Sequence, residues 1–300
     1  MEIIRDEIIK HLPARQETRR LFHGRGHCFP DYTDLLIDIF PPMVLITLYQ
    51  PRPQAWLQQL VQLLHDTLPQ PPAAILLQER QRTSPTSQLL DGNLPKQPVA
   101  LEAGLKYRLR LENVQNIGFF PDMAVGRELV RQHAKGKRIL NLFAYTCSFS
   151  VAALAGGAAQ VVNLDMNKGA LQLGRENHQL NDLDLRKASF LNVELFRSFS
   201  KLRRLAPFDL VICDPPASQG KSFTAERHWP KLISKLPELL HKKGDVLACL
   251  NTPHLPPDFL DGLFQEQWPQ ARLINRYTPG PDFPEADPAK GVSLHHYQVD

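Results

Sequence analysis

A strand, a helix of small residues and a second strand follow one another in residues 138–165, which read RILNLFAYTCSFSVAALAGGAAQVVNLD. The apolar run 138–143 predicts a buried strand, residues 149–155 predict a helix that packs close to it, and residues 160–165 predict the next strand. This order is typical of a unit whose two parallel strands are joined by a crossover helix. The stretch therefore predicts an α/β fold with a parallel sheet.

The same alternation continues toward the C-terminus. A helix is predicted to run through Leu180 and another from Ile233 to His241, and the last two strands should complete one edge of the sheet. Continuous apolar strands separated by helices predict a parallel sheet that is covered on both faces, and we expect this domain to span residues 116–300. Further strands are predicted at 188–192, 208–213, 245–250, 272–274 and 293–299.

The first 115 residues have a different pattern and predict a small α+β domain. Residues 1–24 predict a helix or an extended lead-in, and the Pro41-Pro42 link between two β-like runs predicts a hairpin. The elements expected after the lead-in are strands at 35–40 and 43–49, a helix around 56–64, and strands at 73–77 and 105–111.

Composition narrows the class of protein. The 300 residues carry a formal net charge of +4, which allows a nucleic-acid partner without indicating one. The N-terminus has no long apolar core and no stretch approaches the length of a membrane helix, so we expect neither a signal peptide nor a membrane anchor, and a cytoplasmic location.

No metal site is predicted. The four cysteines form no C-x-x-C pair, and His295-His296 has no third ligand in sight. Basic clusters at 135–138, 201–204 and 241–243 are more typical of a solvated surface than of phosphate contacts. If RNA is bound, however, we expect the cluster at 135–138 and the N-terminal unit to form one face beside the binding pocket.

Polar groups follow each of the first four predicted strands of residues 116–300, and ligands of open parallel sheets bind beyond those strand ends. Asp165 could accept hydrogen bonds from two ribose hydroxyls, and Met166 could pack on a purine. Each feature alone also fits a helix cap or a turn, but four in order are more specific. They are the turn 143–148, Asp165-Met166, Asn192-Val193-Glu194 and Asp214-Pro215-Pro216.

These residues resemble the sequence motifs of a known family. Residues 141–154, Asp165 and Asp214-Pro215-Pro216 resemble motifs I, II and IV of class I S-adenosylmethionine-dependent methyltransferases. Residues 102–107 and 116–127 further resemble bacterial 23S ribosomal RNA methyltransferases of the RlmI and RlmK type. The resemblance implies a Rossmann-like sheet, S-adenosylmethionine as cofactor and RNA as partner, with residues 1–115 as a candidate RNA-substrate domain. The PUA domain common in relatives is expected to be absent.

The resemblance also implies roles for individual residues. Asp214, Pro215 and Pro216 are predicted to be catalytic, and Asp122 and Arg127 should flank the amino-acid end of the cofactor. The full set of predicted cofactor contacts is Phe120, Asp122, Arg127, Asn141, Phe143, Tyr145, Cys147, Ser148, Asp165, Met166, Asn192, Val193 and Asp214.

Two departures from the family matter. Cys147 stands where the family has glycine, and its side chain is expected to crowd the methionine part of the cofactor. Methylation of C5 of cytosine needs a thiolate nucleophile, but Cys213 and Cys249 precede the loops where one is expected and should be buried. We therefore predict transfer to an exocyclic amine held by Asp214 and the Pro215 carbonyl. Ala217 cannot stack on a base, whereas Phe223 is a candidate.

Three alternatives remain open. The chain could methylate a small molecule or a protein, or it could be a cofactor-binding scaffold that has lost catalysis, as the Cys147 substitution and the unusual loop at 217–223 suggest. A dehydrogenase is disfavoured because the first turn lacks G-x-G-x-x-G.

Overall fold

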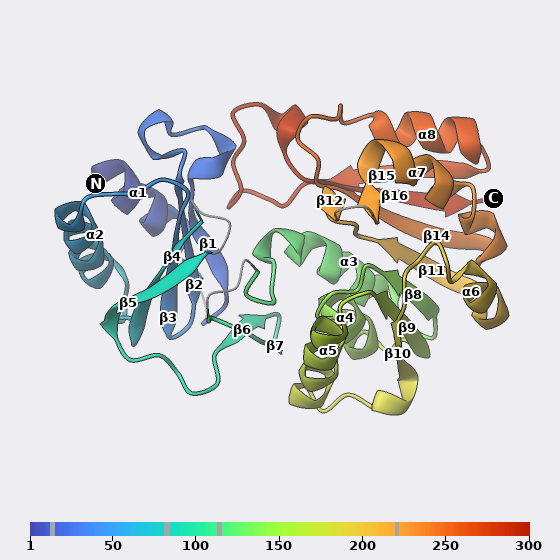
Figure 1. Ribbon diagram of the computed structural model, residues 1–300, viewed down its shortest axis with the longest axis horizontal. Coiled ribbons are helices and arrows are strands. Elements are labelled where there is room, and N and C mark those ends of the chain that lie inside the picture. Colours follow the sequence, from blue (N-terminus) through green and yellow to red (C-terminus); the bar gives the residue numbers. More distant parts are fainter. Residues whose placement is uncertain (13–15, 81–84, 113–115, 220–221) are drawn as a thin grey trace. The chain divides into compact units, whose positions relative to one another are not determined.

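The computed structural model describes residues 1–12, 16–80, 85–112, 116–219 and 222–300 (Figure 1). These residues form two compact units. The N-terminal unit contains Met1–Pro121 and the segment Gly280–Pro288, and the C-terminal unit contains Asp122–Pro279 and Ala289–Asp300. We call Gly280–Pro288 the C-terminal insertion, because the chain adds it to the N-terminal unit near its end.

A five-stranded sheet forms the centre of the N-terminal unit, with its strands in chain order. Only β3 and β4 are parallel, since α2 (Gln54–Thr67) connects them as a crossover, and all the other pairs are antiparallel. Apolar side chains of α2 and of α1 (Glu2–Lys10) join the strands in one buried cluster. The strands are β1 (Arg19–His23), β2 (Leu35–Phe40), β3 (Met43–Leu48), β4 (Ala74–Glu79) and β5 (Thr86–Gly92).

The hairpin and the helix of this unit were predicted correctly, but the strand expected at 105–111 is shorter than predicted. The observed strand, β7 (Leu105–Arg108), pairs with β6 (Val99–Glu102) in a separate two-stranded sheet. The missing member of the main sheet is β5, a partly exposed strand at the sheet edge. An edge strand with little burial has no regular apolar alternation, so its sequence gives no strand signal.

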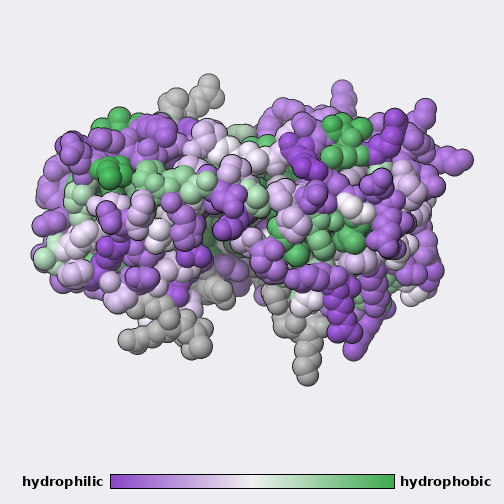
Figure 2. Space-filling model, turned by 90° about the horizontal axis from the view of Figure 1, so that it is seen from above, coloured by the Kyte–Doolittle hydropathy of each residue, from purple (hydrophilic) through white to green (hydrophobic). Residues whose placement is uncertain are grey.

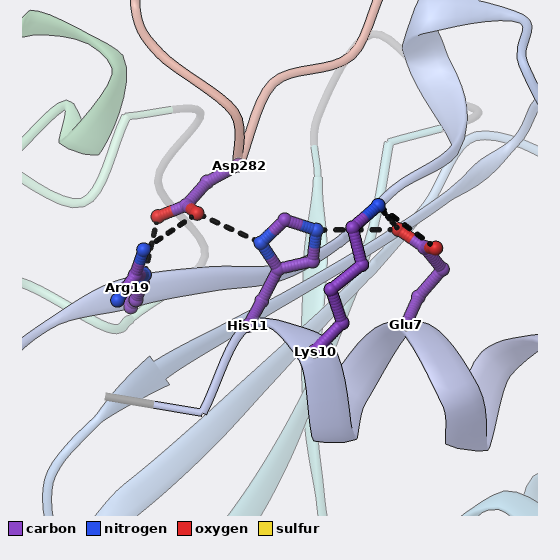
Figure 3. A network of polar contacts seen from close by, with 5 residues as sticks. All are labelled: Glu7, Lys10, His11, Arg19 and Asp282. Carbon is purple, nitrogen blue, oxygen red and sulfur yellow. Dashed lines mark hydrogen bonds and ion pairs between the residues drawn. The ribbon is translucent and has the colours of Figure 1, made fainter. Parts of the chain in front are cut away.

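The C-terminal insertion is tied to the start of the chain by an ionic network (Figure 3). The carboxylate of Asp282 accepts hydrogen bonds from both Nε and Nη2 of Arg19, at 2.5 and 2.9 Å. Nδ1 of the buried His11 lies 2.8 Å from Asp282 Oδ1, and its Nε2 lies 3.2 Å from Glu7, which Lys10 also contacts. The end of α1 and the start of β1 are thus held by one carboxylate from the far end of the sequence.

The C-terminal unit contains the predicted α/β sheet, with the strand order β10-β9-β8-β11-β14-β16-β15 (Figure 1). The first five strands are parallel, and β16 is antiparallel to both β14 and β15, which completes one edge as predicted. The strands are β8 (Arg138–Leu142), β9 (Gln160–Asp165), β10 (Ala188–Asn192), β11 (Phe208–Cys213), β14 (Leu240–Leu250), β15 (Ala271–Tyr277) and β16 (Ser293–Val299). The order reverses at β8, which places the topological switch point beside that strand.

Helices cover both faces of this sheet, as the sequence predicts. One apolar cluster joins the sheet to α6, α7 and α8, and a second joins the opposite face to α3 and α4. The α-helices of this unit in the described residues are α3 (Ala124–His133), α4 (Ser148–Ala155), α5 (Lys168–Leu180), α6 (Phe199–Leu205), α7 (Ala225–Ile233) and α8 (Phe259–Gln267).

The helix predicted at 233–241 is wrong. The α-helix lies earlier, as α7, and residues 236–238 form a single 3-10 turn around Pro237 before β14 begins at Leu240. Proline lacks the N–H that an interior α-helical position uses, so Pro237 disfavours a helix across residues 233–241, although α7 accommodates Pro230 within it.

The surface of the molecule is mostly hydrophilic on the face in Figure 2, with hydrophobic side chains gathered in small areas. Within the described ranges, no helix combines the length and the apolar character needed to cross a bilayer.

The Asp282 network generates a first prediction. Replacing Asp282 with Asn should lower the local stability of α1 and β1 by about 1–3 kcal/mol, because Arg19 loses a charge-assisted partner. Asp300→Asn is the matched control, since Asp300 pairs with Arg272 on the exposed surface, where such pairs contribute less than about 1 kcal/mol. Hydrogen exchange of residues 2–10 and 19–23 measures the difference, and equal protection in the two variants would contradict it.

Candidate functional site

The ends of four strands meet at one edge of the C-terminal sheet. Leu142 of β8 is in register with Leu164 of β9 and with Cys213 of β11, and Asn192 of β10 is in register with Asp165. The residues that follow these positions therefore leave the sheet side by side. The structure brings the turn after β8, Asp165-Met166 and the Asp214-Pro215-Pro216 loop to a common edge, as the sequence predicts.

The turn after β8 has an unusual backbone. Phe143, Tyr145 and Cys147 have positive φ angles of 56°, 47° and 61°, although none is glycine. Side-chain-bearing residues rarely adopt this region, and such conformations gather at functional sites where neighbouring contacts hold them. Here the N–H of Tyr145 donates to Asp165 Oδ2 at 2.7 Å, and Asn177 Nδ2 of α5 donates to the Thr146 carbonyl at 3.0 Å.

Cys147 occupies this turn because α5 makes room for it. Its side chain is completely buried and belongs to a small cluster with Ala144 and Leu171. A Cβ at Gly174 of α5 would lie only 2.5 Å from Cys147 Sγ. The expectation that the Cys147 side chain crowds the cofactor is therefore wrong, because the thiol packs against α5 and has no accessible surface.

Asp165 ends β9 with its carboxylate already partly engaged. Oδ2 accepts from Tyr145 N and Oδ1 accepts from Asn167 N, both at 2.7 Å. Burial raises the pKa of Asp165, and these backbone hydrogen bonds oppose that rise. Each carboxylate oxygen has a second lone pair, so the pair of oxygens can still accept from two further hydroxyl groups.

A buried polar chain lies beneath the turn. His178 Nδ1 is 2.7 Å from the Gly174 carbonyl, which only accepts, so Nδ1 carries the proton and Nε2 accepts from Ser150 at 2.9 Å. Asn163 donates to Ser150 at 3.0 Å and accepts from Asn141 at 2.9 Å. Asn141 is thus buried within the sheet layer. Its Oδ1 has no hydrogen-bond partner among the residues that the structure describes.

A small pocket opens between the ends of β8 and β9 and the segment after β10. Sequence reasoning identified Asp165 and Met166 here but missed Phe196, which has no motif and is brought in by the fold. The Asn192 side chain donates to the carbonyls of Asp165 and Met166, so it holds this turn, and Val193 packs on the core beside it. The lining residues are Phe143, Leu164, Asp165, Met166, Glu194, Leu195, Phe196 and Ser222.

The Asp214 carboxyl group lies in a charged cluster at the same edge. Burial and the neighbouring Asp122 raise its pKa to about 7, while the Cys249 thiol and Arg127 act in the opposite direction. Arg127, on α3, is itself only 1% exposed. The structure thus brings Asp122 and Arg127 to Asp214, and it adds Cys249, which the sequence did not single out as a partner.

The two thiols nearest the loop are buried, as the sequence predicts. Cys213 and Cys249 are 0% and 1% exposed, and burial raises the pKa of both. Phe223, the candidate for stacking on a base, is also buried and packs against Phe143, His228 and Trp229. That role is wrong for Phe223, because its ring has no accessible face. Residues 220 and 221 of the loop lie outside the described residues.

The basic cluster at 135–138 does not lie beside the pocket. Lys137 and Arg138 sit at the start of β8, at the opposite edge of the sheet. Lys137 pairs with Asp245 at 2.7 Å, and the Arg138 guanidinium donates to the carbonyls of Leu205 and Pro207. The expected RNA contact by this cluster is therefore wrong.

The structure also places four further residues that the sequence analysis named. His295 and His296 each lie about 3 Å from a carboxylate, of Asp261 and of Asp245 respectively. Phe120 belongs to the N-terminal unit and is 41% exposed. Ser148 begins α4, directly after Cys147.

Comparison with known proteins gives consistent matches. A family model described as S-adenosylmethionine-dependent methyltransferase matches residues 19–297. The ribosomal RNA large subunit methyltransferase I of Tolumonas auensis is 31% identical over 210 residues, which cover 67% of this chain and 53% of that protein. The ribosomal RNA large subunit methyltransferase K/L of Shewanella sp. (strain MR-4) is 35% identical over 188 residues, or 60% of this chain and 26% of that protein.

The chain thus spans about half the length, or less, of these curated relatives. Among solved structures, SMU.776 in complex with SAH matches with a TM-score of 0.84 and 24% identity, over 95% of this chain and 76% of that one. This likeness concerns the fold.

The site fits S-adenosylmethionine, the cofactor of the matched family. Asp165 retains acceptor capacity for ribose hydroxyls, and the pocket beside it offers Phe143, Met166 and Phe196 to a purine. The Asp122 and Asp214 carboxyl groups offer negative charge to the ammonium of an amino-acid group, and the buried Arg127 beside them balances part of that charge. We keep Asp165 as the predicted ribose acceptor.

Asp165→Ala should weaken binding of S-adenosylhomocysteine by about 1.5–3 kcal/mol, because hydrogen bonds to a charged acceptor are lost. Asp165→Asn, which keeps one acceptor oxygen, should lose less. Calorimetry on the cofactor-free protein measures both, with Asp184→Ala, on the surface after α5, as the control. Unchanged affinity in Asp165→Ala, with a normal melting temperature, would contradict the assignment.

Gly174→Ala should destabilise the C-terminal unit by about 1–3 kcal/mol, because the added methyl group meets Cys147 Sγ. Cys147→Gly removes the obstacle and suits the positive φ, so the double variant should recover most of the loss. Thermal unfolding of the two single variants and the double variant measures this coupling. Additive effects would show that the two residues do not compete for space.

Proposed function

The chain belongs to the S-adenosylmethionine-dependent methyltransferase family, and from this we propose that it transfers a methyl group to a base of RNA. The observation that carries the proposal is the position of the Asp214-Pro215-Pro216 loop, which leaves the sheet next to the strained turn after β8. Relatives named as ribosomal RNA large subunit methyltransferases favour ribosomal RNA as the substrate. They also favour a cytoplasmic location.

The proposed reaction uses two acceptors of this chain. Bound S-adenosylmethionine supplies an electrophilic methyl group on a sulfonium centre. Asp214 and the Pro215 carbonyl accept hydrogen bonds from an exocyclic amine and direct its lone pair at that methyl group, so positioning supplies much of the rate. As the nitrogen–carbon bond forms and the carbon–sulfur bond breaks, the nitrogen loses a proton. Asp214 takes this proton, because its pKa of about 7 suits a base at neutral pH.

A thiol nucleophile has no place in this scheme. Attack on a pyrimidine ring requires an accessible thiolate with a lowered pKa. Burial raises the pKa of both Cys213 and Cys249, and their side chains have almost no accessible surface. An exocyclic amine needs no such nucleophile.

We propose the N-terminal unit as the RNA-contacting domain. Arginine side chains lie over aromatic rings there: the Arg25 guanidinium is 4.6 Å from the centre of Tyr49, and that of Arg52 is 5.1 Å from Trp56. Planar cations next to aromatic faces suit both the bases and the phosphates of single-stranded RNA.

A deletion strain tests the proposal. Mass spectrometry of its ribosomal RNA nucleosides should show one methylated nucleoside lost relative to the parent. The wild-type gene should restore it, and Asp214→Ala, with activity reduced by about 10²–10⁴-fold, should not. Restoration by Asp214→Ala would rule out the assigned role, and an unchanged nucleoside profile would rule out ribosomal RNA. A covalent adduct with RNA containing 5-fluorocytosine, lost in a cysteine variant, would overturn the exclusion of a thiol.

A further inference from the structure

The loop Asp214-Pro215-Pro216 cannot hold its own shape by backbone hydrogen bonds. Pro215 and Pro216 have no N–H, so the two positions that follow Asp214 offer acceptors but no donors. A rigid arrangement of the Asp214 carboxylate and the Pro215 carbonyl therefore needs donors from elsewhere in the chain.

The neighbouring strand supplies these donors. β14 runs parallel to β11 with Cys213 in register with Ala248, so the residues after this pair, Asp214 and Cys249, lie next to each other. The Cys249 thiol therefore lies beside the Asp214 carboxylate as a hydrogen-bond donor that lowers the pKa of that group. Asn251, just beyond the end of β14, donates from Nδ2 to the Pro215 carbonyl at 3.1 Å.

We propose that Cys249 and Asn251 are positioning residues that hold the Asp214 carboxylate and the Pro215 carbonyl in the orientation a substrate amine meets. The inference rests on the proposed function for the role of the two acceptors. Each donor engages one acceptor, and a carbonyl or carboxylate oxygen retains a second lone pair for the substrate. Both donors come from one strand end, so the two acceptors are fixed relative to one another.

The charges around Asp214 decide how the proposal is tested. The groups that act on its pKa are Asp122, before α3, Arg127 on α3 and Cys249 on β14. Cys213, the residue before Asp214, has its side chain in the cluster on the other face of the sheet. Asp122 raises the pKa of Asp214, whereas Arg127 and the Cys249 thiol lower it. Loss of the thiol donor must therefore move the titration of Asp214 to higher pH.

Difference infrared spectroscopy of the carboxyl band lost in Asp214→Asn follows this titration in the cofactor-free protein. Asp214 in the wild type should titrate near pH 7. Cys249→Ala should shift the midpoint to higher pH, whereas Cys249→Ser, which keeps a donor of similar size, should not. Cys213→Ala is the matched control, because Cys213 is equally buried but its side chain belongs to the core cluster on the opposite face of the sheet.

Equal midpoints in Cys249→Ala and the wild type would overturn the proposal. So would equal shifts in Cys249→Ala and Cys213→Ala, since both would then reflect burial alone. If Cys249→Ala does not fold, an upward shift in Cys249→Ser is the contradicting result. Because the titration needs no substrate, it can fail or succeed independently of the proposed RNA methylation.

Methyl-transfer activity tests the proposed role of Asn251. Asn251→Ala should lower kcat by about 10–100-fold at an unchanged affinity for S-adenosylhomocysteine, because a misplaced acceptor affects the reacting geometry rather than cofactor binding. The pH at which kcat/KM is half-maximal should stay near that of the wild type. An unchanged kcat in Asn251→Ala would overturn the proposed role of Asn251, and so would a parallel loss of cofactor affinity.

Discussion

The N–H of Tyr145 donates to the Asp165 carboxylate, and with the backbone hydrogen bond from Ala144 to Leu164 it joins the turn after β8 to the end of β9. The turn holds three non-glycine residues at positive φ, each of which costs on the order of 1–3 kcal/mol. Contacts such as these hydrogen bonds are needed to offset that cost. The same carboxylate is the predicted ribose acceptor, so one side chain contributes both to the shape of the turn and to the predicted affinity for the cofactor.

The C-terminal sheet and the order of its site segments could be predicted from the sequence for a simple reason. Buried parallel strands such as β8 and β11 are continuous apolar runs, and their carboxyl ends must share one edge. Asp165 and Asp214 directly follow such runs, which is why both were found. Lys137 and Arg138 lie at the start of β8, and the same rule, applied to the opposite end of the strand, places them at the far edge.

What the sequence did not reveal depends on contacts between distant residues. β5 has few buried side chains, so its membership of the N-terminal sheet depends on pairing with β4. From the sequence Cys147 is an obstacle, and the position of Gly174 of α5 opposite it removes that conflict. Cys249 and Asn251 look like a buried thiol and a loop residue until β14 is set beside β11. In each case a neighbour from another element decides the role of the residue.

The C-terminal insertion affects how this protein is made. Residues 1–121 leave the ribosome long before Asp282, and chains are synthesised at roughly 5–20 residues per second. For on the order of ten seconds, Arg19 and His11 are therefore without the carboxylate that joins α1 to β1 in the finished molecule. The N-terminal unit cannot be completed as a nascent domain. Its final assembly waits until Asp282 has been synthesised, by which time most strands of the methyltransferase sheet already exist.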